Sequence, residues 1–164
     1  MPGVPALLMP AAHALTHARE DAHAAIAGLT AEQLWARPLG VASVAFHVRH
    51  LSGALDRLLT YARGDALSSA QLESLQFEET PGYPLPDAHA LALALDVAVD
   101  RALDQLRHTS EHALLETRSV GRRRVPSTVI GLLVHAAEHA ARHAGQAITT
   151  RGVVIAHAAG VPEK

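Results

Sequence analysis

The amino-acid sequence predicts an all-α protein, both from its composition and from the spacing of its apolar residues. Alanine and leucine, two strong helix formers, supply 33 and 23 of the 164 residues, whereas Val, Ile and Thr together supply 26. Four stretches repeat their apolar residues with helical spacing, and segments rich in Pro, Gly and Ser separate them. This length suits one buried core, so we expect a single domain over residues 1–164.

Two of the expected helices lie in the first half of the chain. The first covers about residues 11–29, and its opposite face carries His13 and His17, which we expect to be exposed. The second begins at Ser43, a favourable N-cap, and ends at Gly64, a favourable C-terminal stop. The apolar stripe of the first helix consists of Leu15, Ala18, Ala22, Ala25, Ile26 and Leu29.

The other two helices lie in the second half. The third follows Pro86 with Asp87 as its cap and reaches about His108; its apolar residues also alternate as in a strand, but length and alanine content favour a helix. The fourth starts after Pro126, with Ser127 or Thr128 as its cap, and continues to Arg151-Gly152. Four helices of about 18 to 25 residues span roughly 27 to 37 Å each, which suits a bundle.

The connection between the second and third helices, residues 65–86, is longer than the usual bundle loop. It contains Phe77, Glu78, Glu79 and Tyr83. Two interpretations stand: the segment covers a functional site as a lid, or it is a plain connector.

Composition and charge exclude several classes of function. The formal net charge of -2 and five aromatic residues argue against a nucleic-acid partner. Prolines and histidines interrupt the uncharged N-terminal stretch, so we expect neither a membrane span nor a signal peptide. The absence of cysteine is compatible with the cytoplasm, and it means that any thiol in the chemistry comes from outside the chain.

Histidine is the unusual residue, with twelve in the chain. On the fourth helix His135, His139 and His143 are spaced i, i+4, i+8, and Gln146 extends the same stripe. Neighbours at i, i+4 can bind one ion, but the outer pair is about 12 Å apart along the axis. One ion therefore takes His135 with His139, or His139 with His143, and needs a ligand from another helix.

The second helix supplies that ligand, because His47 and His50 lie beside its apolar stripe. Two histidines from one helix and one from another make a site of three nitrogens with open positions, as in reactive metal centres. Packing and hydrogen bonding in the core are the alternative explanation for these five histidines. The residues from His135 to His139 also match the H-x-x-E-H zinc-peptidase motif, but the short remaining chain argues against a peptidase.

Two segments carry a recognisable combination of motifs. Ser43–Gly64 contains His47-Val48-Arg49-His50, and His135–Gln146 contains the His139-x-x-x-His143 spacing followed by the step Gly145-Gln146. Together they resemble the DinB/YfiT-like superfamily of metal-binding bundles. The resemblance implies a four-helix bundle of up-down-down-up topology that is often a homodimer. It also implies one divalent metal ion, zinc or nickel, with His50, His139 and His143 as ligands. Gln146 would then hydrogen-bond a ligand imidazole or a metal-bound water, or else occupy a boundary position. His47 and His135 would lie behind the ligands or face the substrate, and packing alone is the alternative for both.

The resemblance further implies an activity, for which two classes remain open. The first is a metal-dependent transferase or isomerase that brings a small thiol onto the ion and adds it to an electrophile. The second is a non-catalytic, stress-linked metal-binding or interaction module. The fourth position of the ion distinguishes them, because an enzyme keeps it open.

Overall fold

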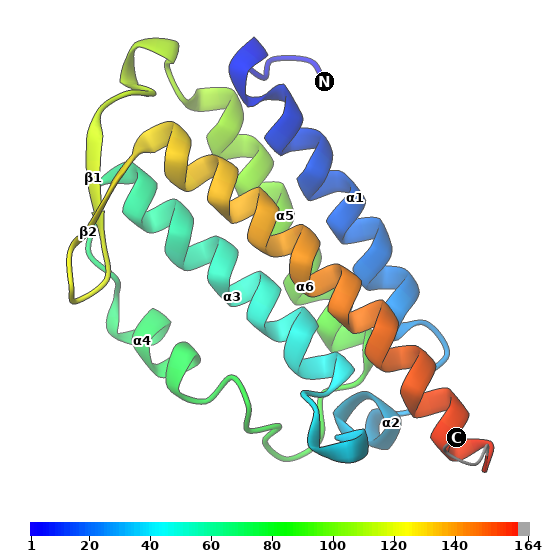
Figure 1. Cartoon of the computed structure of the whole chain (residues 1–164). Coiled ribbons are helices and arrows are strands. Elements are labelled where there is room, and N and C mark those ends of the chain that lie inside the picture. Colours follow the sequence, from blue (N-terminus) through cyan, green and yellow to red (C-terminus); the bar gives the residue numbers. More distant parts are fainter. Residues whose placement is uncertain (161–164) are drawn as a thin grey trace.

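The computed structural model describes residues 1–160 and confirms the all-α prediction (Figure 1). Its four long helices are α1 (Met9–Ile26), α3 (Val44–Arg63), α5 (Ala88–His108) and α6 (Val129–Ala158). The shorter elements are α2 (Ala31–Trp35), α4 (Ser69–Gln76), the 3-10 turns Ala6–Leu8, Pro38–Gly40 and Glu111–Ala113, and the strands β1 (Thr117–Val120) and β2 (Val125–Thr128).

The long helices begin and end at the residues that suit these positions. The side chains of Ser43, Asp87 and Thr128 accept hydrogen bonds from backbone N–H groups three residues further on, in α3, α5 and α6. Thr128, rather than Ser127, therefore caps α6. Gly64 ends α3 with φ of 87°, a left-handed conformation that glycine adopts without strain. The segment 88–108 is a helix and not a strand.

The expected end of the last helix, at Arg151-Gly152, is wrong, because α6 continues to Ala158. A glycine ends a helix only where the backbone turns left-handed, and Gly152 keeps a helical conformation. Tertiary contacts also support the extra turns: Val154 is buried, and the Arg151 guanidinium donates to the carbonyl oxygen of Ala27 at 2.7 Å.

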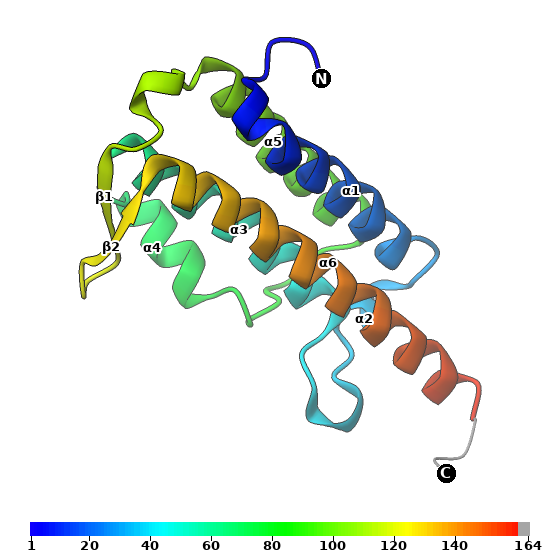
Figure 2. The same ribbon diagram turned by 45° about the horizontal axis from the view of Figure 1, so that its top comes forward.

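The four long helices pack as a bundle in which α6 and α5 each lie between α1 and α3. Figures 1 and 2 show α1 and α6 running in one direction and α3 and α5 in the other. The buried residues of α1 and α6 are largely alanine, so these two helices can approach closely. Helices α3 and α6 pack against each other, and the candidate metal ligands lie on these two helices.

A β-hairpin that the sequence analysis did not predict precedes α6. Strands β1 and β2 pair antiparallel, with Thr117 opposite Thr128. The backbone N–H groups of Val129 and Ile130 then donate to the carbonyls of Glu116 and Leu114, which attaches the first turn of α6 to the chain before the hairpin. The strands are only four residues long and largely exposed, so no apolar alternation marks them. Over residues 1–160, no helix is long and apolar enough to cross a membrane.

Candidate metal centre

Helices α3 and α6 bring His50, His139 and His143 to one place. Each imidazole offers one nitrogen, and these three atoms lie within 4.8 Å of one another. The Nε2 atoms of His50 and His139 are 3.0 Å apart, and the ring centre of His143 is 4.5 Å from that of His50. The three residues expected as ligands from the resemblance therefore share one half-buried site.

The geometry of this cluster fits a divalent metal ion. Two nitrogens that bind one tetrahedral zinc ion at about 2.0–2.1 Å are roughly 3.3 Å apart, close to the 3.0 Å between His50 and His139. The donor set of three imidazoles is that of a reactive zinc centre with one position left open. Among residues 1–160, no other group of three or more His, Cys, Asp or Glu side chains has a comparable geometry.

The protonation state of the cluster also suits coordination. Burial, together with the nearby imidazoles, lowers the pKa of His139 and lowers the pKa of His143 to about 4. Both rings are therefore neutral near pH 7, and neutral imidazole is the form that binds metal.

Glu78 contacts Nδ1 of His50, the ring nitrogen that does not face His139. Nδ1 of His50 donates to Oε2 of Glu78 at 2.6 Å, and the guanidinium of Arg57 donates to the other carboxylate oxygen at 2.5 Å. Burial alone would raise the pKa of Glu78, but the contacts with His50 and Arg57 outweigh it and lower that pKa. An ionised Glu78 keeps the proton on Nδ1, so Nε2 of His50 presents its lone pair to His139 and His143.

A glycine leaves the room for this carboxylate. A Cβ atom at Gly53, in the middle of α3, would lie 2.6 Å from Oε1 of Glu78 and 2.8 Å from Nη1 of Arg57. Because real Cβ atoms do not approach other atoms so closely, the pair would have to move. Gly53 thus allows the Glu78–Arg57 pair to lie directly against the helix that carries His50.

His47 supports His143 in a similar way. Its Nδ1 lies 3.2 Å from Nδ1 of His143, and its side chain is buried. Coordination through Nε2 places the proton of His143 on Nδ1, which can then donate to Nδ1 of His47. Burial and the neighbouring His50 lower the pKa of His47, so it is neutral and can accept this bond.

The family description that matches this sequence is the DinB superfamily, over residues 14–147. The chain belongs to the DinB superfamily. It is also similar in fold to a solved structure titled as the conserved protein of a locus from Enterococcus faecalis, with 22% identity and a TM-score of 0.70. That match covers 90% of this chain and 96% of the other. No curated protein matches this sequence.

Two further residues expected beside the ligands, His135 and Gln146, differ in their surroundings. His135 is half exposed, with its ring centre 5.7 Å from that of His139. Its Nδ1 is 3.4 Å from Glu138, whose other carboxylate oxygen pairs with Arg142. Gln146 is exposed, and its side chain makes no hydrogen bond within the part of the chain that the structure describes. Its contact with a metal-bound water therefore stays a prediction.

On α6, His139 and His143 are the two histidines that lie with His50 in the three-histidine cluster. The structure groups His139 with His143 at His50, whereas the alternative pair, His135 with His139, does not form a three-residue cluster. The Arg142 guanidinium lowers the pKa of Glu138 and holds its carboxylate on the exposed side of α6. The H-x-x-E-H interpretation thus has no geometric support in this DinB protein.

Sequence reasoning missed the roles of Glu78, Arg57 and Gly53. Glu78 was noted only as part of the long connection, and it is 28 residues from His50 along the chain. No local spacing marks a contact over that separation. Because Glu78 reaches the imidazole of His50, the segment 65–86 contributes to the site and is more than a plain connector.

Proposed function

We propose that this DinB-superfamily protein binds one divalent metal ion, zinc or nickel, through His50, His139 and His143, and uses it as an enzyme. The observation that carries the proposal is the convergence of three imidazole nitrogens within 4.8 Å, with Glu78 buried behind one of them. A bound ion of this kind lowers the pKa of a coordinated thiol or water so that it becomes a nucleophile near neutral pH.

An open fourth position supports catalysis over a purely structural role. Glu78 is the nearest buried carboxylate, but its two oxygens already accept from His50 and Arg57. The cluster therefore offers three protein nitrogens, and a small molecule can take the remaining place. We propose a thiol-dependent transferase or isomerase, with an external thiol because the chain has no cysteine.

The residues around the cluster would have different roles in metal binding and proton transfer. Glu78 orients His50, and His47 orients His143, so both ligand rings are held before an ion arrives. His135 is partly exposed beside His139 and can exchange protons with solvent or substrate. We also propose that the protein is cytoplasmic, which cell fractionation would test. We propose further that it is a homodimer, which light scattering of the purified protein would test.

Metal content tests the first part of the proposal. The unaltered protein should hold about one equivalent of zinc or nickel by elemental analysis, and His50→Ala, His139→Ala and His143→Ala should each lose most of it. His13→Ala is the matched control, because His13 is exposed on α1 and should leave the content unchanged. Equal metal content in all of these variants would contradict the assigned ligands.

Turnover tests the second part. The zinc- and nickel-loaded protein is assayed with a panel of small thiols and electrophiles, with the His139→Ala variant as the inactive control. Metal-dependent turnover is the expected result. Stoichiometric metal without turnover, together with a His50→Ala variant that loses stability alone, would favour the non-catalytic metal-binding module.

A further inference from the structure

A small cavity opens beside the three-histidine cluster, on the side of the 65–86 segment. Its volume is about 220 Å³, and His50 and His139 form one part of its wall. Ala54 and Leu58 of α3 form another, and Leu67 and Leu75 line it from the connecting segment. Aliphatic side chains therefore lie beside the two candidate ligands in a cavity that is open to solvent on one side.

The charge in this wall is already neutralised. Arg57 also lines the cavity, but its guanidinium donates to the buried carboxylate of Glu78. The remaining polar groups come from Tyr61 and His135. A strongly charged ligand would lose part of its hydration in this cavity without gaining a free counter-ion, whereas an apolar one would bury part of its surface against leucine.

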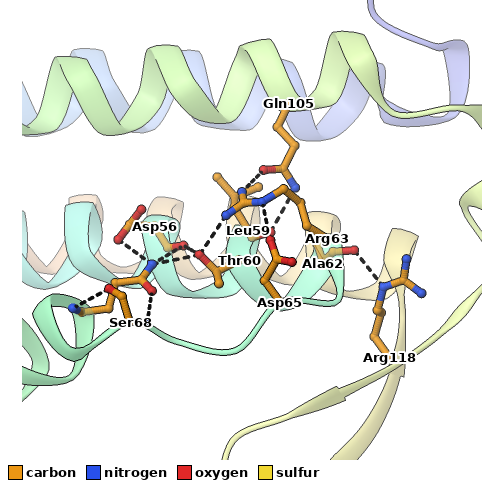
Figure 3. Close-up of polar contacts among 10 residues, drawn as sticks. Asp56, Leu59, Thr60, Ala62, Arg63, Asp65, Ser68, Gln105 and Arg118 are labelled. Carbon is orange, nitrogen blue, oxygen red and sulfur yellow. Dashed lines mark hydrogen bonds and ion pairs between the residues drawn. The ribbon is translucent and has the colours of Figure 1, made fainter.

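The segment that carries Leu67 and Leu75 is held against α3 on both sides of the cavity. At the start of α4, the Gln71 side chain donates to the Asp56 carboxylate at 2.7 Å and to the Thr60 hydroxyl at 2.8 Å, and Ser68 caps the helix. Figure 3 shows Asp56 and Thr60 of α3 on the side that faces Ser68. Beyond α4, Glu78 contacts His50, and Arg49 donates to the carbonyl of Thr80 at 2.7 Å. The cavity wall is therefore positioned by the same segment that orients a candidate ligand.

The volume limits what the cavity can hold. An apolar cavity of about 150 Å³ accepts benzene, so 220 Å³ accepts one ring with a short substituent, roughly nine non-hydrogen atoms. A peptide-sized thiol would extend beyond it into solvent. The space matches a small substrate with a ring-sized apolar body.

We propose that this cavity binds the apolar, ring-sized body of the substrate, with its metal-binding group directed at His50 and His139, and that Leu75 of α4 sets this specificity. The inference rests on the proposed metal site and adds the class of substrate. Leu67, Leu58 and Ala54 complete the apolar wall.

The test uses two probes with the same metal-binding group, acetohydroxamate and benzohydroxamate, on the zinc-loaded full-length protein. Only benzohydroxamate has a ring to place in the cavity, so it should bind at least tenfold more tightly by calorimetry. The Leu75→Trp variant fills the cavity and should abolish that preference while zinc binding and acetohydroxamate affinity stay within twofold. Leu72→Trp is the matched control, because Leu72 and Leu75 lie on α4 with 46% and 45% exposure but only Leu75 lines the cavity.

The results distinguish failure of the proposed substrate cavity from failure of the proposed metal site. Zinc binding with equal affinity for the two hydroxamates would overturn the inference and leave the metal site intact. A ring preference that survives Leu75→Trp, or that Leu72→Trp abolishes equally, would also overturn it. Failure of zinc to bind the unaltered protein, measured before any hydroxamate is added, would overturn the metal site itself.

Discussion

Nδ1 of His50 donates a hydrogen bond of 2.6 Å to the buried carboxylate of Glu78, and this contact joins the long connecting segment to the candidate metal centre. The carboxylate stays ionised because Arg57 occupies its other oxygen and both contacts lower its pKa. A histidine oriented in this way presents Nε2 to an ion with a fixed ring angle and greater basicity.

Replacing the carboxylate by an amide should weaken metal binding while preserving the shape of the side chain. We expect Glu78→Gln to lower zinc affinity by about 10- to 100-fold, as measured by competition with a chromophoric chelator. Glu79→Gln is the control, because Glu79 is exposed and its nearest cation, Arg37, is 3.8 Å away. Equal zinc affinity in the two variants would show that Glu78 does not support His50.

The contact between His47 and His143 should be sensitive to the loss of an acceptor. We expect His47→Leu to lower zinc affinity about tenfold, because Nδ1–H of a coordinated His143 would be buried without a partner. His47→Asn places a carbonyl oxygen near the lost nitrogen and should restore most of that affinity. His135→Leu should change zinc affinity little, since His135 lies outside the cluster. Similar losses in the Leu and Asn variants would indicate that His47 acts through packing instead.

Gly53→Ala should be destabilising even though alanine is the better helix former. The new Cβ would displace the Glu78–Arg57 pair, so we expect a loss of about 1–2 kcal/mol in urea unfolding and weaker zinc binding. Gly145→Ala provides the control on α6, because a Cβ there meets no atom within 4 Å. That substitution should stabilise the protein by about 0.5–1 kcal/mol. A stabilised Gly53→Ala variant with normal zinc affinity would contradict the packing described for Glu78.

The metal-free protein should lose stability as the pH falls from about 6.5 towards 4. In this range the unfolded chain binds a proton at residue 143, whereas burial holds the pKa of His143 in the fold at about 4. The unfolded state then binds more protons, so the free energy of unfolding decreases on acidification. The shift corresponds to at most about 3 kcal/mol, and we expect about 2 because solvent reaches part of the ring.

Urea unfolding of the metal-free protein at pH 7 and pH 4.5 measures this change. The His143→Gln variant has no group to titrate at that position and should show a smaller decrease. Identical pH dependence in the two proteins would mean that another group is responsible. The pKa of Glu78 is also lowered, so its contribution is likewise lost on acidification, but only below about pH 4.5, where an unfolded glutamate binds its proton.

Much of the fold was predictable because local signals mark the ends of the long helices. Ser43, Asp87 and Thr128 cap them, and Gly64 ends α3 as expected. The errors lie where tertiary contacts override such signals. Gly152 remains helical because Val154 and Arg151 pack on the bundle, and the hairpin forms from short exposed strands that lack an apolar pattern.

The ligands could be proposed from the sequence because helical spacing places His139 and His143 on one face, and the family resemblance selects His50. Spacing alone left two pairs on α6 open. The packing of α3 against α6 decides between them, since it brings His50 to His139 and His143 and leaves His135 at the edge of the neighbouring cavity.

By itself, then, the sequence determined the helical class, most helix ends and the residue types available for a metal. These follow from interactions between residues a few positions apart. Only the tertiary structure decided that Glu78 holds His50, that Gly53 makes room for it, and that Leu75 lines a cavity beside the cluster. Such contacts join residues far apart in the chain, and no local spacing specifies them because they form only when the long segment folds back along α3.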